Sequence, residues 1–118
     1  MQAAGKKIES LVREYLEHQG FIFISANYRC FHGEIDLIMR DHDTLVFIEV
    51  RYRSQNHYGE GTTTVNFTKR QKLKKTAVHY LQKHHLYDRT ACRFDIVSVS
   101  GKREYIIDWI RDAFWEKW

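Results

Sequence analysis

The sequence predicts an α/β fold in which helices flank a mixed β-sheet. Two observations support this prediction. An apolar stripe at helical spacing precedes several segments whose apolar residues alternate as in strands. A second amphipathic segment then lies between strands, where it can form the crossover that makes two strands parallel. The predicted element order is helix, three strands, helix, two strands and a short terminal helix.

The composition is that of a folded protein with a modest basic surplus. The chain has 118 residues, which suits one domain spanning residues 1–118. Its apolar content of 43% argues against disorder. Lys and Arg outnumber Asp and Glu by 19 to 15, which favours polyanionic partners without requiring them. No apolar run is long enough to span a bilayer and the N-terminus has no signal-peptide core, so we expect a soluble cytoplasmic protein without membrane association.

The first half of the chain has clear helix and strand patterns. Residues 5–19 carry apolar side chains at i, i+3, i+4 and i+7, and Gly20 suits the C-terminal end of a helix. Residues 21–28 are rich in β-forming side chains and predict the first strand. Residues 33–53 contain two alternating runs around a short polar turn, which predicts a tight antiparallel hairpin.

The middle of the chain predicts a loop followed by a helix. Residues 53–67 are polar, contain two glycines and show little period, which is typical of a mobile loop. Thr68 and Gln71 have the spacing of a capping box, which predicts the start of a second helix. Its buried stripe continues to about His84.

The last third predicts two strands and a terminal helix. Residues 93–99 alternate again, and residues 104–107 suit a short last strand. Asp108 is a suitable N-cap for a helix that begins near Trp109.

The most informative feature of the sequence is that each run of the hairpin carries one carboxylate. If His42 and Asp43 form the turn, paired residue numbers have a constant sum and Asp36 lies opposite Glu49. Directly opposed residues share one face, with β-carbons roughly 4.5–5.5 Å apart. Two carboxylates would converge there closely enough to hold one divalent cation. Arg51 would add a positive charge on the same face.

The sequence leaves the role of these carboxylates open. A buried carboxylate without a partner costs several kcal/mol, so Asp36 either contributes to a cation site or forms a salt bridge with Arg51 or a lysine. Glu9 flanks the apolar stripe of the first helix, where it can point toward the sheet or into solvent. The histidines lack zinc-site spacing. Cys30 and Cys92 form no ligand pattern and are expected to be reduced thiols.

The predicted second helix carries the strongest charge cluster of the chain. A basic helical face is usually just solvated, but this one begins beside the polar loop, and its N-terminal amides favour an anion. Tyr52, Tyr58 and Phe67 lie near these charges and could stack on bases, although such residues are more often core or loop anchors. The basic residues are Lys69, Arg70, Lys72, Lys74, Lys75 and Lys83.

Taken together, these residues resemble the PD-(D/E)xK nuclease core. In that core, a carboxylate on one strand is followed about a dozen residues later by a carboxylate, any residue and a basic residue. From about Gly5 to Phe114 the chain is similar to the YraN family of uncharacterised bacterial proteins, which resemble archaeal Holliday-junction resolvases. The residues that carry the resemblance are Gly5, Glu9, Asn27, Tyr28, Arg29, residues 33–38, residues 46–50, Lys69, Gln71, Arg93, Phe94, Asp95, Asp112, Ala113 and Phe114.

The resemblance implies a restriction-endonuclease-like fold and a metal-dependent endonuclease that acts on DNA, branched DNA included. Mg²⁺ or Mn²⁺ is the implied cofactor. Symmetric cleavage of a four-way junction would also call for a two-fold homodimer. The implied catalytic residues are Asp36, Glu49, Arg51 and Glu9, with Asp36, Glu49 and Glu9 as metal ligands. The implied nucleic-acid contacts are Lys69, Arg70, Gln71 and Lys72.

The chain departs from the nuclease motif at two positions. Ile35 stands where a proline usually precedes the first carboxylate, which is a minor change. Arg51 replaces the motif lysine and cannot release a proton near neutral pH, so it can stabilise negative charge but cannot act as a base. The alternative function is therefore a catalytically impaired nucleic-acid-binding protein that retains the nuclease fold. A third is a protein-interaction domain that uses its aromatic C-terminus.

Overall fold

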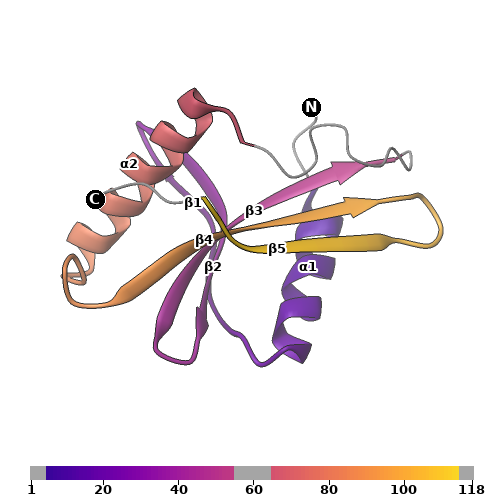
Figure 1. Ribbon diagram of the computed structural model, residues 1–118, viewed down its shortest axis with the longest axis horizontal. Coiled ribbons are helices and arrows are strands. Elements are labelled where there is room, and N and C mark those ends of the chain that lie inside the picture. The colour runs from indigo at the N-terminus through magenta and orange to yellow at the C-terminus, as the bar shows by residue number, and fades with distance from the viewer. Residues whose placement is uncertain (1–4, 55–64, 115–118) are drawn as a thin grey trace.

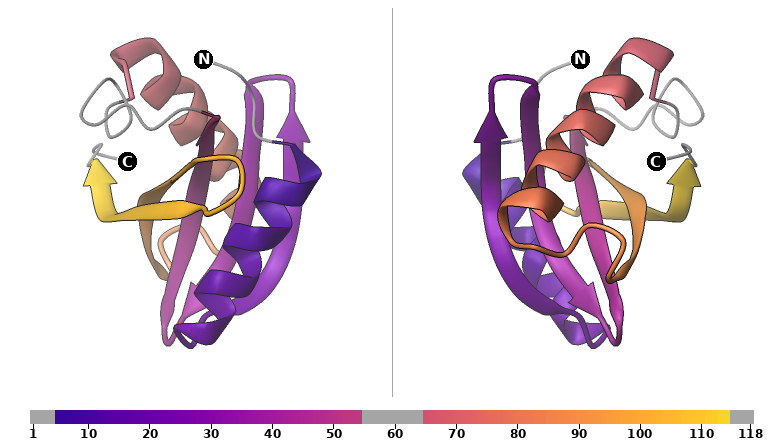
Figure 2. Two further views of the ribbon diagram at one scale, coloured as in Figure 1. Left: turned by 90° about the vertical axis from the view of Figure 1, so that its right-hand side faces the viewer. Right: turned by 90° about the vertical axis from the view of Figure 1, so that its left-hand side faces the viewer.

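The computed structural model describes residues 5–54 and 65–114. Five strands form one mixed sheet in the order β1-β2-β3-β4-β5, and the two helices lie on opposite faces of it (Figures 1 and 2). This arrangement confirms the predicted α/β class and is consistent with a restriction-endonuclease-like fold. The elements are α1 (Lys6–His18), β1 (Ile22–Cys30), β2 (Gly33–Asp41), β3 (Thr44–Arg53), α2 (Phe67–Lys83), β4 (Ala91–Ser100) and β5 (Ile106–Phe114).

The two helices cover separate hydrophobic cores. Ile8, Val12 and Leu16 of α1 are buried against one face of the sheet, as the apolar stripe predicts. On the other face, Leu73 and Leu81 of α2 are buried in a second cluster. Among the described residues, no helix is both long and apolar enough to cross a membrane.

The hairpin has the predicted register. Strands β2 and β3 are antiparallel, and their pairs run in constant register from Asp41↔Thr44 to Leu37↔Ile48. His42 has a φ of 56°, the left-handed conformation that a tight hairpin turn requires. The turn therefore sets which side chains of the two strands face each other.

Helix α2 is the predicted crossover between parallel strands. It leads from β3 to β4, and these strands pair in parallel from Thr44↔Ala91 to Arg53↔Ser100. The predicted capping box at Thr68 is wrong. Asn66 caps the helix instead, because its side chain accepts a hydrogen bond of 2.8 Å from the Lys69 amide. Most of the predicted loop, residues 55–64, lies outside the described residues.

The predicted terminal helix is wrong, because β5 continues as a strand to Phe114. It pairs antiparallel with β4, with Trp109 opposite Val97. Asp112 has a φ of 51°, which interrupts the strand alternation. Ala113 consequently packs on the α2 side of the sheet, the same side as the next residue, Phe114, while Trp109 packs on the α1 side. The apolar positions 109, 110, 113 and 114 therefore have the spacing of an amphipathic helix.

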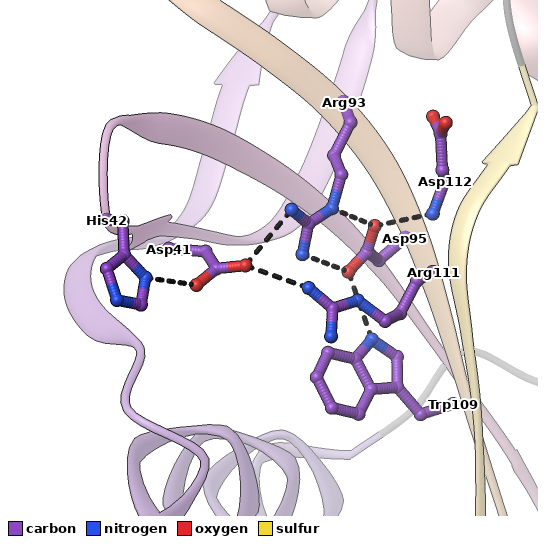
Figure 3. Close-up of polar contacts among 7 residues, drawn as sticks. All are labelled: Asp41, His42, Arg93, Asp95, Trp109, Arg111 and Asp112. Atoms are coloured by element: carbon purple, nitrogen blue, oxygen red, sulfur yellow. Dashed lines mark hydrogen bonds and ion pairs between the residues drawn. The ribbon is translucent and has the colours of Figure 1, made fainter.

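A buried carboxylate fastens β5 to β4 (Figure 3). The side chain of Asp95 is fully buried and accepts hydrogen bonds from Arg93 Nε at 3.0 Å and Trp109 Nε1 at 3.0 Å. It also accepts a bond of 2.9 Å from the Asp112 amide. The guanidinium charge and these N–H donors compensate the buried negative charge.

The same arginine connects this carboxylate to the hairpin turn. Arg93 also forms an ion pair of 3.1 Å with Asp41, which in turn pairs with Arg111 at 3.0 Å (Figure 3). A bond from His42, followed by those of Arg93, holds the pKa of Asp41 below its ordinary value. We refer to Asp41, His42, Arg93, Asp95, Trp109, Arg111 and Asp112 as the β5 network.

Candidate metal and phosphate site

The strand alternation of β2 breaks at Asp36. Leu37 packs on the α1 side, whereas Ile35 packs on the α2 side. In a regular strand these two residues would share one face. Asp36 Oδ2 accepts a hydrogen bond of 2.8 Å from the Val50 amide. If the register of β2 and β3 continued, Val50 would lie opposite Ile35, and its amide would donate to a main-chain carbonyl of β2. The Asp36 side chain accepts this hydrogen bond instead.

Asp36 and Glu49 lie together on the two neighbouring strands. Burial and the negative charge of Glu49 together raise the pKa of Asp36 to about 8, although the hydrogen bond from Val50 lowers it. The side chains of Asp36 and Glu49 also share a hydrogen bond. Near neutral pH, the pair therefore holds a proton that an isolated aspartate would have released.

Two basic side chains adjoin this pair. Lys69, in the first turn of α2, has its Nζ 3.5 Å from Oε2 of Glu49. Arg51 is 5% exposed and follows Glu49 on β3. Burial lowers the pKa of Arg51, and the charge of Glu49 opposes that shift. A guanidinium nonetheless stays protonated in proteins, so both groups present positive charge beside the carboxylates.

Glu9 points toward the sheet and is 8% exposed. Both of its oxygens accept from Asn27 Nδ2, at 3.1 and 3.3 Å, and the same amide donates to Glu34 at 2.9 Å. Burial raises the pKa of Glu9, the Asn27 bond lowers it, and the charges of Glu34 and Glu49 raise it again. Of the two orientations that the sequence allowed for Glu9, the structure has the inward one.

Sequence reasoning assigned no site role to Asn27 and Glu34. Asn27 has a φ of 54°, and this left-handed conformation inside a strand is uncommon outside Gly, Asn and Asp. An asparagine within a β-rich segment was the available signal, because asparagine is depleted in regular strands. The irregularity places the Asn27 amide between the carboxylates of Glu9 and Glu34.

The oxygen donors of this region suit a hard divalent cation. Asp36 and Glu49 offer two carboxylates, and the adjacent Val50 carbonyl is a further oxygen donor. In the part of the chain that the structure describes, no three His, Cys, Asp or Glu side chains are grouped closely enough to hold a metal by themselves. A cation here would therefore complete its shell with water, as Mg²⁺ commonly does.

The comparisons with known proteins give one consistent result. The model of the uncharacterised protein family UPF0102 matches residues 8–99. The chain belongs to UPF0102. This membership confirms the predicted relation to the YraN family.

Several UPF0102 proteins are similar to this chain over nearly their whole length. One from Coxiella burnetii (strain RSA 331 / Henzerling II) is 48% identical over 112 residues, which cover 95% of this chain and 92% of the relative. One from Nitrosomonas europaea is 44% identical over 117 residues, with 97% and 98% covered. One from Legionella pneumophila (strain Corby) is 42% identical over 113 residues, with 96% and 95% covered.

The remaining predicted contact residues of this UPF0102 chain occupy different environments. Lys72 is exposed, while Gln71 is half-buried. Arg70 donates a 2.8 Å bond to the Val65 carbonyl and lies over the ring of Phe67. Arg70 and Lys72 add positive charge to α2 beyond Lys69, whereas Gln71 is neutral.

The aromatic residues considered for base stacking also differ. Tyr52 donates its hydroxyl to the Gly101 carbonyl at 2.8 Å and packs against Tyr105, so it is an anchor for the β4–β5 turn. Phe67 is 63% exposed at the start of α2. Tyr58 lies outside the described residues.

Proposed function

We propose that this UPF0102 protein is a metal-dependent endonuclease that hydrolyses phosphodiester bonds in DNA. The observation that carries the proposal is the buried pair of Asp36 and Glu49 beside Lys69 and Arg51. Burial and the charge of Glu49 raise the pKa of Asp36 to about 8, so the negative charge of Asp36 is poorly compensated within the protein. Perturbed carboxylates of this kind are typical of functional sites.

Asp36, Glu49 and the Val50 carbonyl would hold Mg²⁺ or Mn²⁺, and Glu9 would act from the edge of the site. When bound, the cation would polarise a phosphodiester and lower the pKa of bound water. Its charge would replace the proton that Asp36 and Glu49 otherwise retain. Asn27 supports the proposal because it keeps the Glu9 carboxylate directed toward the sheet.

The basic residues would bind the substrate and stabilise the charge that develops in the reaction. The guanidinium of Arg51 is buried on the strand that carries Glu49, where a fixed positive charge can stabilise a pentacovalent phosphorane. Lys69, together with Arg70, Gln71 and Lys72, would hold the nucleic-acid backbone. Binding through such contacts weakens as salt rises.

A second candidate is a nucleic-acid-binding protein without catalytic activity. The observation that favours it is Arg51, because an arginine cannot accept the proton of an attacking water. This candidate predicts retention of DNA at moderate salt without cleavage.

The deciding experiment is cleavage of labelled linear, flapped and four-way DNA with Mg²⁺ or Mn²⁺. We expect wild-type protein to cut at least one substrate and Asp36→Ala to lose at least about a thousandfold in rate, on the order of 4 kcal/mol of barrier. DNA binding by Asp36→Ala should be unchanged or tighter, because a negative charge is removed. Asp43→Asn is the matched control, since Asp43 is exposed in the hairpin turn.

Two results would contradict the endonuclease proposal. One is cleavage that survives Asp36→Ala, which would place the chemistry elsewhere or in a contaminant. The other is a silent wild-type protein whose Arg51→Lys variant cuts, which would establish the second candidate, a binding protein one residue from activity.

A further inference from the structure

The turn between β1 and β2 presents an aromatic side chain to solvent. Phe31 is 89% exposed, more than any other large apolar side chain that the structure describes. Its ring centroid lies 3.9 Å from that of His32, the other residue of the turn. An exposed phenyl group gains nothing from burial within its own chain, and such groups often mark interaction surfaces.

Residues on both sides of this turn contact helix α2, which lies beside it (Figure 1). On the β1 side, the Tyr28 hydroxyl lies 2.7 Å from Nδ1 of His79. On the β2 side, Gly33 packs so closely that an added β-carbon would lie 3.3 Å from Thr76 Oγ1. The exposure of Phe31 is therefore imposed by a well-supported turn, and its ring is presented in a defined place.

A basic hollow lies between this turn and helix α2. Its volume is about 200 Å³, and it is lined by His32, Lys74, Lys75, Val78, His79 and Gln82. Lys75 lies six residues after Lys69, which corresponds to about 9 Å along the helix axis and about a third of a turn around it, with the exposed Lys72 between them. A short run of extended polynucleotide can span that distance, with phosphates near both lysines.

We infer that Phe31 and this basic hollow bind an unpaired nucleic-acid strand next to the phosphodiester held at Asp36 and Glu49. An aromatic face beside positive charge is the composition of single-strand binding surfaces, because each unpaired base offers a flat face and each nucleotide a phosphate. The phosphates of a duplex could bind the lysines, but its bases could not stack on the Phe31 ring because they already stack on one another. A second copy of this chain has a net charge of +4, so the positive charge of the hollow favours a polyanion over that copy. The position of the strand relative to the cleaved bond rests on the proposed function.

The test is binding of labelled oligothymidine and of a labelled duplex of the same length, both in EDTA. Phe31→Ser should weaken oligothymidine binding about tenfold and leave duplex binding nearly unchanged, because one base-stacking contact is lost. Phe31→Tyr should restore the affinity. Ile22→Ser is the matched control, because Ile22 is 63% exposed at the other end of β1.

The lysine contribution is measured from the salt dependence of the same binding. Lys75→Ser should reduce the slope of log affinity against log salt by about 0.7, the value for one contact to a single strand. Lys102→Ser removes the same charge from the β4–β5 turn, at the opposite end of the molecule in Figure 1, and should leave the slope unchanged. Thermal melting of each variant confirms that the fold is intact.

The outcomes separate this inference from the proposed function. Wild-type affinity for oligothymidine in Phe31→Ser would overturn the inference, as would equal losses for single strand and duplex or no wild-type binding in EDTA. Conversion of a dimer to a monomer by Phe31→Ser, with binding unchanged, would also overturn it. Phe31-dependent binding without any cleavage would support the inference and contradict the nuclease, whereas Asp36-dependent cleavage without a Phe31 effect would do the reverse.

Discussion

The protein contains two centres of carboxylates that differ in how their charge is compensated. In the β5 network, Asp95 is fully buried, but it pairs with an arginine and accepts hydrogen bonds from an indole N–H and a main-chain amide (Figure 3). At the candidate site, Asp36 receives one main-chain amide and faces Glu49, and its pKa rises to about 8. Burial alone therefore does not determine how the charge of a carboxylate is compensated. The two centres differ because Asp95 pairs directly with an arginine, whereas Asp36 faces another carboxylate.

The largest difference between the two centres is expected from one chemical change made in each. Asp95→Asn should lower the free energy of unfolding by about 3 kcal/mol, because it removes the buried negative charge that pairs with Arg93 and leaves that guanidinium only its ion pair with Asp41. Asp36→Asn should leave stability unchanged or raise it in EDTA at pH 8, because it removes a carboxylate that repels Glu49. Urea titrations measure both, with Asp108→Asn on the exposed face of β5 as control. Equal losses in the two variants would remove the distinction.

Metal binding should stabilise the protein through the candidate site and not through the β5 network. Mn²⁺ at a hundredfold excess over its dissociation constant should raise the free energy of unfolding by about 2.7 kcal/mol. Asp36→Asn and Glu49→Gln should abolish this gain, while Asp43→Asn should keep it. Thermal melting with and without Mn²⁺ is the measurement, and a gain that persists in Asp36→Asn would show that the cation binds elsewhere.

The stability of the metal-free protein should fall as pH rises from 5 to 8. The pKa of Asp36 is about 8 in the folded state, against an ordinary value of 3.8. Between these two pKa values, the folded state keeps a proton on Asp36 that the unfolded chain has lost. The stability that this proton gives the folded state decreases as the pH rises toward 8. We expect a decrease of about 2 kcal/mol over this range, discounted for the partial exposure of Asp36.

The β5 network should show the opposite pH dependence. The pKa of Asp41 lies below its ordinary value of 3.8, so its contribution is present above that pH and is lost on acidification through its folded pKa. Urea titrations from pH 3 to 8 therefore separate the two centres. Asp36→Asn should flatten the curve above pH 5 and leave the acid limb unchanged, and a wild-type curve that is flat above pH 5 would contradict the raised pKa.

The smallest effect is expected at the exposed end of the β5 network. Arg111→Ala should cost less than about 0.5 kcal/mol, because Arg111 is 57% exposed and Arg93 still pairs with Asp41. Arg93→Ala should cost several times more, since it also leaves Asp95 buried without its cation. A loss for Arg111→Ala equal to that for Arg93→Ala would mean that the network acts as a single unit.

Local patterns were sufficient for the core of the site. The turn at His42 and Asp43 lies within the hairpin, and a tight turn sets the register of both strands. The approach of Asp36 to Glu49 could therefore be predicted from the turn and the register that it sets, even though the alternation of β2 breaks at Asp36. The parallel placement of β4 also followed from a helix between two strands, because such crossovers return the chain to the same sheet.

Contacts between distant segments determined what the sequence patterns misjudged or left open. Residues 109–114 have a spacing that suits a helix, but they continue the strand from Ile106 along the edge of β4, and Asp95 accepts a hydrogen bond from the Asp112 amide. The helical pattern allowed Glu9 to face either solvent or the sheet. The hydrogen bonds that Asn27 donates, from 18 residues later in the chain, hold Glu9 toward the sheet. Periodicity describes one element at a time, whereas a buried charge is stabilised by donors from other elements, so the compensation of each carboxylate depends on tertiary structure.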